Sequence, residues 1–217
     1  MKNEKKQIII VGARADGHAG VVLDIIKEYG LYEVIGFLDD DVLLYNKKIL
    51  GVPVKGAIKE YFMRPSADTD NFFIGNGNNL FREKWHKYIK EKSFNLVNVI
   101  HPTAVVSASV SIGEGVFIGA NVSITHGAVV GNGVLLNTAV TIEHDNIIED
   151  FVNISPGSHM SGRVKIKKRA FLGSGVIAIP DIVIGEDAVV GAGSVLIRDV
   201  EKNSKVCGSP ARKMSES

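Results

Sequence analysis

The chain contains a single cysteine, Cys207, among its 217 residues. One thiol cannot form an intrachain disulfide, so a hydrophobic core must hold the fold, and a reducing compartment suits the chain. Long apolar runs are also missing near the N-terminus, where residues 8–12 form a short one. That run is too short for a signal sequence or a membrane span and predicts a buried strand. We therefore expect a cytoplasmic protein without membrane insertion.

An excess of one charge is equally absent. The 25 Lys and Arg residues are balanced by 24 Asp and Glu residues, which leaves a formal net charge of +1. No broad basic surface is expected, and nucleic acid is not an expected partner. The content of hydrophobic residues, 45%, is ordinary for a globular protein, and the length allows one large domain or two small ones.

What the chain does contain is an internal repeat of six residues that begins near residue 100. The register never slips, and all but one of the repeat positions are Ile, Val, Leu or Met. A second set of small or β-branched residues follows four positions after each of these, and Asn146 and Ser158 interrupt it. The repeat positions are Ile100, Val106, Ile112, Ile118, Ile124, Val130, Leu136, Ile142, Ile148, Ile154, Met160, Ile166, Leu172, Ala178, Ile184, Val190 and Leu196.

A period of six fits neither a helix nor an alternating strand, but it suits a short strand followed by a turn. We expect the aliphatic residue to point inward and stacked units to bury a continuous core. The next residue is often glycine, as at Gly113 and Gly131, and we expect glycine there to supply backbone angles that other residues resist. The alternative, a β-sandwich, predicts spacings of roughly 8–12 residues with variable gaps.

This repeat resembles the left-handed parallel β-helix of the hexapeptide acyltransferases, in which three hexapeptides form one triangular coil. The resemblance implies that every third repeat stacks on the same face. The stretch from Val206 to Met214 resembles the closing segment of that family, which lies near coenzyme A.

The first 98 residues differ, because strand and helix patterns alternate in them. Such alternation predicts a small Rossmann-like parallel α/β sheet at residues 1–98, followed by the β-helix at residues 99–217. Ligands of these sheets bind at the carboxyl ends of the strands, which here carry residues 12–18, Asp39 with Asp40, and residues 75–78. The expected strands are residues 7–11, 32–38 and 72–74, and the expected helices are residues 18–29, 57–63 and 80–92.

A dinucleotide site is one interpretation of this first domain. Residues 12–20 do not form a clean G-x-G-x-x-G motif, although Asp39 stands where an acidic residue would bind a ribose. Nothing in the second half resembles a hydride-transfer domain. A partial Rossmann-like module that holds a nucleotide-sugar fits the pattern better.

Several motifs narrow the resemblance over nearly the whole chain. They are Gly17-His18, Asp39-Asp40, Gly77-Asn78-Asn79 with Arg82, Leu136-Asn137-Thr138, Ile142-Glu143-His144-Asp145 and Ile154-Ser155-Pro156-Gly157. They resemble the bacterial N-acetyltransferases of nucleotide-linked 4-amino-4,6-dideoxy sugars and the sialic acid O-acetyltransferases. The resemblance implies acetyl-CoA as the donor, a UDP- or GDP-linked amino sugar as the acceptor, no metal, and a homotrimer with coenzyme A between neighbours. It also implies a role in bacterial surface glycan or glycoprotein biosynthesis.

One segment departs from the family pattern. Residues 12–18 hold two more residues than the turn of the relatives, with Arg14 and Asp16 as new side chains. This turn meets the phosphates in the family. Arg14 either pairs with a phosphate or is a solvated loop residue.

Acetyl transfer to an amine needs a general base, and histidine suits this role because it titrates near neutral pH. Of the six histidines, His144 stands two positions after Ile142, at an expected turn, and Asp145 follows it directly. A neighbouring carboxylate can orient the ring and stabilise its protonated form. The resemblance implies that His144 is the base and that Asp145 raises its basicity, although the family more often has Glu at the second position.

Other site residues follow from the resemblance position by position. His126, one coil before His144, either positions the substrate or is a surface residue. Asn137 matches a position near the sugar, and Asn153 replaces a His that contacts acetyl-CoA in close relatives, so that contact loses its charge. Backbone N–H groups at the coenzyme A site could also stabilise an oxyanion. The positions that match the lining of that site are Gly162, Ser174 and Ala192.

At the nucleotide end the resemblance assigns roles to three segments. It places Asp16, Gly17 and His18 at the phosphates. It places Asp39 and Asp40 at the base or ribose, although Asp also favours a solvated turn. Gly77 is assigned to the sugar-nucleotide.

Two functions of other classes are alternatives. A γ-type carbonic anhydrase shares the β-helix but needs three His on zinc from neighbouring coils. The next His after His144 is His159, 15 residues on, and no two histidines stand closer in the sequence, which disfavours such a zinc site. A nucleotide-sugar-binding scaffold without activity is the other, and the pair of His144 and Asp145 argues against it. Within the acetyltransferases, the nucleotide, the sugar stereochemistry and amine or hydroxyl as acceptor stay open.

Overall fold

The computed structural model describes residues 5–13, 17–30, 32–63 and 68–214. It divides into two compact units, Met1–Val99 and Ile100–Ser217.

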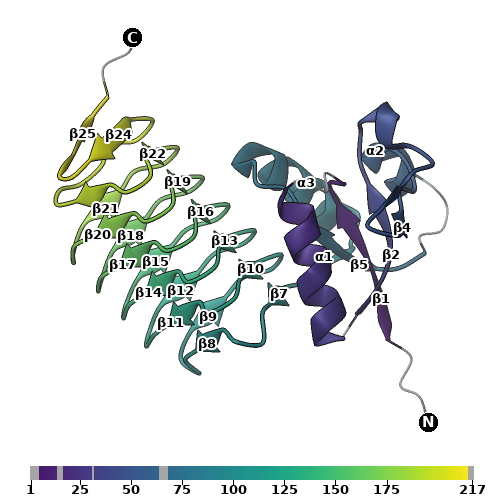
Figure 1. The fold of residues 1–217 in the computed structure, drawn as a ribbon, viewed down its shortest axis with the longest axis horizontal. Coiled ribbons are helices and arrows are strands. Elements are labelled where there is room, and N and C mark those ends of the chain that lie inside the picture. Colours follow the sequence, from purple (N-terminus) through teal and green to yellow (C-terminus); the bar gives the residue numbers. More distant parts are fainter. Residues whose placement is uncertain (1–4, 14–16, 31, 64–67, 215–217) are drawn as a thin grey trace. The chain divides into compact units, whose positions relative to one another are not determined.

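The first unit is built on a four-stranded parallel sheet in the order β2-β1-β5-β6 (Figure 1). Its strands are β1 (Lys6–Val11), β2 (Tyr32–Leu38), β5 (Asn71–Ile74) and β6 (Asn95–Leu96). Its helices are α1 (His18–Tyr29), α2 (Ile58–Phe62) and α3 (Asn79–Glu91). A short 3-10 helix, η1 (Val42–Leu44), and an antiparallel hairpin of β3 (Lys48–Ile49) and β4 (Val52–Pro53) join β2 to α2.

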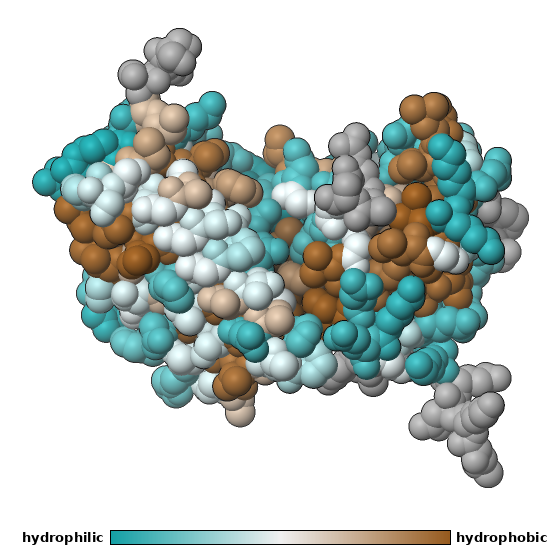
Figure 2. Space-filling view, in the orientation of Figure 1, coloured by the Kyte–Doolittle hydropathy of each residue, from teal (hydrophilic) through white to brown (hydrophobic). Residues whose placement is uncertain are grey.

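Helices cover both faces of this sheet, because β1 is apolar on both sides: Ile8, Ile9 and Ile10 are all fully buried. Ile9 packs in one cluster with Ile58 of α2 and Ile89 of α3. Ile10 points to the opposite face, which α1 covers. Exposed apolar side chains gather over the η1 and α2 end of the unit (Figure 2), among them Val42, Leu43 and Met63.

The predicted Rossmann-like unit is confirmed, with each expected element within one residue of its expected bounds. The two-residue strands β3, β4 and β6 were not predicted, because two residues are too few to show an alternating pattern.

The second unit is a parallel β-helix, and the predicted fold is confirmed. Short strands stack into three sheets of eight, six and five strands (Figure 1). The eight-stranded sheet holds β7 (Val99–Ile100), β10 (Phe117–Ile118), β13 (Leu135–Leu136), β16 (Asn153–Ile154), β19 (Phe171–Leu172), β22 (Val189–Val190), β24 (Lys205–Gly208) and β25 (Ala211–Lys213). The six-stranded sheet holds β8 (Val105–Val106), β11 (Ser123–Ile124), β14 (Thr141–Ile142), β17 (His159–Met160), β20 (Ile177–Ala178) and β23 (Val195–Leu196). The five-stranded sheet holds β9 (Ser111–Ile112), β12 (Val129–Val130), β15 (Ile147–Ile148), β18 (Lys165–Ile166) and β21 (Val183–Ile184).

Residues one coil apart stack in register. Thr141 pairs with His159 across the parallel strands β14 and β17, and the two residues are 18 apart in sequence. Within each strand the second residue points inward, and Ile142, Ile154 and Ile166 are fully buried in one continuous core. This close stacking determines which residues share a corner of the β-helix.

The expected reason for the repeat glycines is wrong. Gly113 and Gly131 do not have positive φ, but a Cβ atom at Gly131 would lie 2.8 Å from the backbone nitrogen of Asp150 in the next coil. Glycine is needed there because the coils approach closely. The left-handed conformation occurs two residues later, at every sixth residue from Gly115 to Gly193, and many of these residues are not glycine.

Candidate active site

The turn after β14 carries the two residues that were expected to be catalytic. It lies at the corner between the six-stranded and five-stranded sheets, just after the buried Ile142. Asp145 occupies the left-handed position of this turn, with φ of 59°, a conformation that Asp tolerates better than most residues. Nδ1 of His144 lies 2.9 Å from Oδ2 of Asp145, and the two side chains are about half exposed. The turn therefore presents a coupled imidazole and carboxylate to solvent.

The protonation of this pair follows from Asp145. The hydrogen bond with His144 holds the pKa of the Asp145 carboxyl below its usual range, and the charges of His126 and Arg163 act in the same direction. An ionised carboxylate only accepts hydrogen bonds, so Nδ1 of His144 must donate. In the neutral ring, Nε2 is then the atom that can accept a proton.

Two glycines make room for the pair. A Cβ atom at Gly162, one coil after His144, would lie 2.5 Å from Nε2 of the imidazole. A Cβ atom at Gly127, one coil before Asp145, would lie 2.6 Å from Oδ1 of its carboxylate. The imidazole thus rests on Gly162, which is buried beneath it, and larger side chains at either glycine would displace the pair.

An ion pair lies further along the same corner. Arg163 binds Asp181 with both ends of its guanidinium, Nε to Oδ1 at 2.6 Å and Nη2 to Oδ2 at 2.8 Å. These bonds lower the pKa of Asp181 and raise that of Arg163. Asp181 therefore holds the guanidinium, while Asp145 keeps the imidazole of His144 as its partner.

His126 lies on the opposite side of Asp145 along this corner. Its backbone oxygen accepts a 2.9 Å hydrogen bond from the N–H of Asp145, and its Nδ1 lies 3.1 Å from Oγ of Ser109. The exposed ring therefore belongs to the same row as His144, as its spacing predicted.

The remaining predicted residues of the β-helix lie in the eight-stranded sheet, as Asn153 does in β16, or at its corner with the six-stranded sheet. Asn137 follows β13 and donates from Nδ2 to Oδ1 of Asn153 at 3.1 Å and to the backbone oxygen of Ile154 at 2.8 Å. Ser174 and Ala192 are exposed, one coil apart, at the corner between the eight-stranded and six-stranded sheets. Within the described part of the chain, no hydrogen bond or ion pair connects these residues with His144 or Asp145.

At the carboxyl ends of β1 and β5, the first unit holds a partly buried histidine and a buried arginine. Gly17 precedes α1, and His18 is its first residue. Burial, aided by the charge of Arg82, lowers the pKa of His18 to about 4, so this ring is neutral at pH 7. Arg14, a candidate contact of the phosphates, and Asp16, which the resemblance places at the phosphates, lie outside the described residues.

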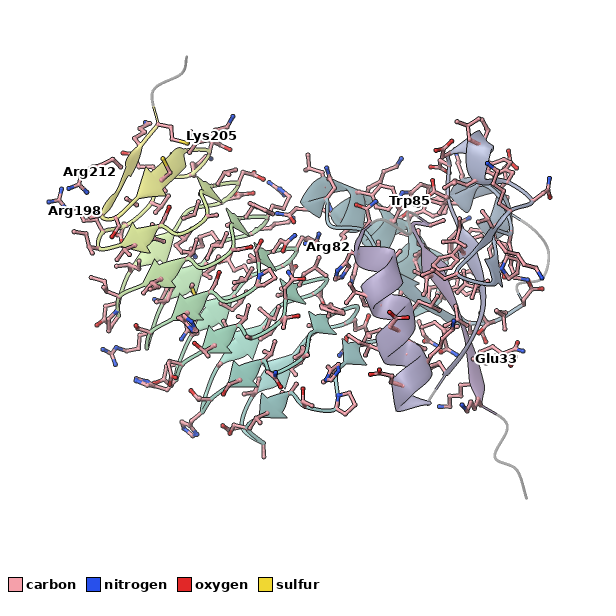
Figure 3. All side chains as sticks on the ribbon, in the orientation of Figure 1. Glu33, Arg82, Trp85, Arg198, Lys205 and Arg212 are labelled. Carbon is pink, nitrogen blue, oxygen red and sulfur yellow. The ribbon has the colours of Figure 1, made fainter. Side chains whose placement is uncertain are left out.

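Arg82, which Figure 3 labels on α3, orders the loop after β5. Its guanidinium donates to the backbone oxygens of Asn76 and Gly77 at 3.2 and 2.9 Å and to Oδ1 of Asn79 at 2.9 Å. Burial lowers its pKa to about 9. Gly77 is therefore exposed in a loop whose backbone is held by hydrogen bonds from Arg82.

Asp39 and Asp40 follow β2 and bind backbone N–H groups. Asp39 accepts from Ala13 at 2.7 Å and from Asp41 at 2.9 Å, so it ties the end of β2 to the loop after β1. Asp40 accepts from the N–H of Ile58 at 3.0 Å, at the start of α2. These contacts fix both carboxylates at the carboxyl edge of the sheet, which is the edge where parallel α/β sheets generally bind ligands.

Comparison with known proteins identifies the protein family that this chain resembles. Residues 7–89 match the family model of the PglD N-terminal domain, and residues 109–143 and 163–198 match the hexapeptide repeat of succinyl-transferase. The GDP-perosamine N-acetyltransferase of Escherichia coli O157:H7 is 29% identical over 197 residues, 88% of this chain and 87% of that protein.

Solved structures agree along nearly the whole chain. PerB from Caulobacter crescentus, in complex with CoA and GDP-perosamine, gives a TM-score of 0.90 at 35% identity, covering 96% of this chain and 97% of that one. The acetyltransferase domain of PglB from Neisseria gonorrhoeae FA1090, in complex with acetyl coenzyme A, gives 0.88 at 32% identity, covering 97% and 100%. The chain belongs to the hexapeptide-repeat sugar acetyltransferases.

In this sugar acetyltransferase, sequence reasoning missed residues that support the pair of His144 and Asp145. The ion pair between Arg163 and Asp181 and the space at Gly127 were not predicted. The coil spacing was a usable signal, since residues 127, 145, 163 and 181 stand in one row. Opposite charges in consecutive coils of that row were visible in the sequence.

Three further features concern ligands and environment. Among the described residues, no three His, Cys, Asp or Glu side chains are placed to hold a metal ion together. No described helix is both long and apolar enough for a membrane span.

A cleft of about 280 Å³ lies at the C-terminal end of the β-helix, and basic side chains gather there (Figure 3), among them Arg198, Arg212 and Lys213.

Proposed function

We propose that this enzyme transfers the acetyl group of acetyl-CoA to the 4-amino group of a nucleotide-linked 4-amino-4,6-dideoxy sugar, in bacterial surface glycan or glycoprotein biosynthesis. The observation that carries the proposal is the bond between His144 and Asp145, which directs the proton-accepting Nε2 away from the carboxylate. The relatives in complex with CoA and GDP-perosamine support the substrate class. A GDP-linked sugar is therefore the first acceptor to test, and a UDP-linked sugar the second.

In the proposed reaction, the amine nitrogen of the sugar attacks the thioester carbonyl carbon and forms the C–N bond. Nε2 of His144 takes one proton from that nitrogen, and Asp145 stabilises the resulting imidazolium. The C–S bond then breaks, and His144 returns the proton to the thiolate, so that coenzyme A leaves as a thiol. The backbone N–H of Gly162, directly beneath the imidazole, is the proposed donor to the oxyanion.

The proposed nucleotide site uses the carboxyl edge of the first unit. Gly17 precedes α1 and His18 is its first residue, and the N-terminus of a helix attracts phosphate through its free N–H groups. We assign Asp16 with them, and Asp39 and Asp40 to the ribose or base. Gly77 is assigned to the sugar-nucleotide.

The proposed coenzyme A site uses the other end of the chain. Ser174 and Ala192 are exposed at a corner of the β-helix, and Asn153 is a neutral polar residue in β16 of the adjoining eight-stranded sheet. The basic side chains Arg198 and Arg212 line the cleft at the C-terminal end. Their charges suit the phosphates of coenzyme A.

We also propose that the active enzyme is a homotrimer. His144 and Ser174 stand at different corners of one β-helix, so a second copy has to bring a coenzyme A corner to each His144 corner. Apolar side chains on the outer faces are available for such packing, since Val105 is 69% and Ile177 is 43% exposed. Light scattering with the native protein tests this assembly, and a monomer with full activity would refute it.

The test of the reaction is a thiol-release assay with acetyl-CoA against GDP- and UDP-linked 4-amino-6-deoxy sugars and free sialic acid. The amino sugars should release coenzyme A, and His144→Asn should lower kcat by about 1,000-fold while leaving coenzyme A binding intact. His159→Asn is the matched control, because His159 is exposed on β17 and bonded to Thr141. Turnover with sialic acid alone would replace the proposed N-acetylation with O-acetylation, and unchanged turnover of His144→Asn would overturn the role of the base.

A further inference from the structure

Asn146 is a polar residue in a row of the β-helix core that is otherwise apolar. Ala128 occupies the same position one coil earlier, and Val164 and Ile182 occupy it in the next two coils. The side chain of Asn146 is fully buried. A valine would fill this position at lower cost, because a buried amide has to replace the hydrogen bonds it made in water.

The contacts of Asn146 lie in two turns, that of His144 and that of Gly162 in the next coil. Its Nδ2 donates to the backbone oxygen of Glu143 at 2.6 Å and to that of Ser161 at 2.9 Å. Its Oδ1 is buried and accepts no hydrogen bond from the described residues. Glu143 directly precedes His144, and Ser161 directly precedes Gly162. One amide thus joins the turn that holds the imidazole to the turn on which the imidazole rests.

Other buried polar side chains of the core show what Asn146 does differently. The hydroxyl of Ser204 donates to the backbone oxygen of Glu201, three residues earlier in its own turn, at 2.7 Å. Asn146 makes the equivalent bond to Glu143 and adds a second bond to the next coil. A serine can therefore donate within its own turn, and Ser158 shows that a serine can instead donate to the next coil, to the backbone oxygen of Gly173 at 3.1 Å. A hydroxyl has only one hydrogen to donate, whereas the amide of Asn146 has two and bonds to both turns at once.

We propose that Asn146 is a positioning residue for acetyl transfer. It fixes the spacing between the turns of His144 and Gly162, and with it the height of Nε2 above the Gly162 backbone. A displacement of about 1 Å at a reacting group can reduce the rate about 100-fold. The proposal rests on the proposed function of His144 as the base, and it predicts that the chain keeps an energetically unfavourable amide for the sake of catalysis.

The experiment compares three variants of the full-length protein. Asn146→Val, which copies the residue of the next coil, should melt at the same or a higher temperature, and its kcat should fall about 10- to 100-fold with both KM values unchanged. Asn146→Ser should recover part of kcat, because serine can still bond to Glu143. Ile182→Ala, in the same row two coils away, should lower the melting temperature without changing kcat.

An independent readout separates this proposal from the proposed function. Nitrogen-15 imidazole NMR of His144 reports its bond to Asp145 without any turnover, and the His144 signal should shift or broaden in Asn146→Val but not in Ile182→Ala. If the wild-type enzyme acetylates no sugar, the proposed function fails and the NMR comparison still decides the role of Asn146. An Asn146→Val variant with wild-type kcat and an unchanged His144 signal would overturn the inference.

Discussion

The imidazole of His144 rests on the backbone of Gly162, so closely that a Cβ atom there would stand 2.5 Å from Nε2. Gly162 does not have positive φ, so space and not backbone conformation requires the glycine. We predict that Gly162→Ala pushes the imidazole aside and lowers kcat about 100-fold. The melting temperature should change little, because the clash is with a half-exposed side chain.

Gly131→Ala is the control for this prediction. A Cβ atom at Gly131 meets backbone of the next coil, including the nitrogen of Asp150 at 2.8 Å. This variant should therefore lose thermal stability and keep kcat at temperatures where it is folded. Equal activity of Gly162→Ala and wild type in the thiol-release assay would show that the imidazole works from another position.

Replacing the carboxylate of Asp145 tests its role separately from its place in the turn. Asn adopts the left-handed conformation as readily as Asp, so Asp145→Asn should fold normally. It loses the charge that stabilises the imidazolium, and we expect kcat to fall on the order of 100-fold. Asp187→Asn is matched in chemistry and backbone, with φ of 56° at Asp187, and should leave kcat unchanged. Equal losses in the two variants would contradict a specific role for Asp145.

The ion pair of Arg163 and Asp181 should matter through Asp145. Without its partner, the guanidinium in Asp181→Asn would turn to Asp145, whose pKa already responds to its charge. If this competition weakens the interaction of Asp145 with the imidazolium of His144 by about 1.4 kcal/mol, kcat should fall about tenfold. Adding Arg163→Gln to Asp181→Asn should restore kcat. In both variants the free energy of unfolding should change by less than about 1 kcal/mol, because the ion pair is exposed. A double variant slower than Asp181→Asn would refute this coupling.

The partly buried His18 should make the first unit sensitive to acid. The folded pKa of about 4 lies below the usual 6.5, so the unfolded chain binds more protons between these values. Stability from this group is complete above pH 6.5 and is lost as the pH falls toward 4, by up to roughly 3 kcal/mol. Urea titrations followed by the fluorescence of Trp85, the single tryptophan, report this unit because Trp85 is buried in its core.

The variant His18→Gln should flatten that dependence, so that its stability relative to wild type rises as the pH falls from 6.5 to 4. His159→Gln, on the surface of the β-helix, is the control and should follow the wild-type curve. Parallel curves for His18→Gln and wild type would show that His18 does not titrate with a lowered pKa.

Much of the architecture was predictable because its cause is local and periodic. The aliphatic positions such as Ile142 and Ile154 have to be buried, and a period of six allows this only when coils stack. The role of the following glycines was misjudged, since the close approach of Asp150 to Gly131 exists only between coils. The strands β3 and β4 were not predicted, because a strand of two residues is too short to show an alternating pattern.

The sequence by itself determined the β-helix and its register, and therefore that His126, His144 and Gly162 share a corner. Periodic burial of side chains is enough for that conclusion. Only the tertiary structure decided which partner each polar side chain takes. Arg163 can reach carboxylates in either neighbouring coil, and its pairing with Asp181 depends on rotamers and on the exact approach of three coils. The amide of Asn146, an interruption of the repeat in the sequence, became interpretable only when its two carbonyl partners were found, one in the turn of His144 and one in the turn of Gly162 beneath it.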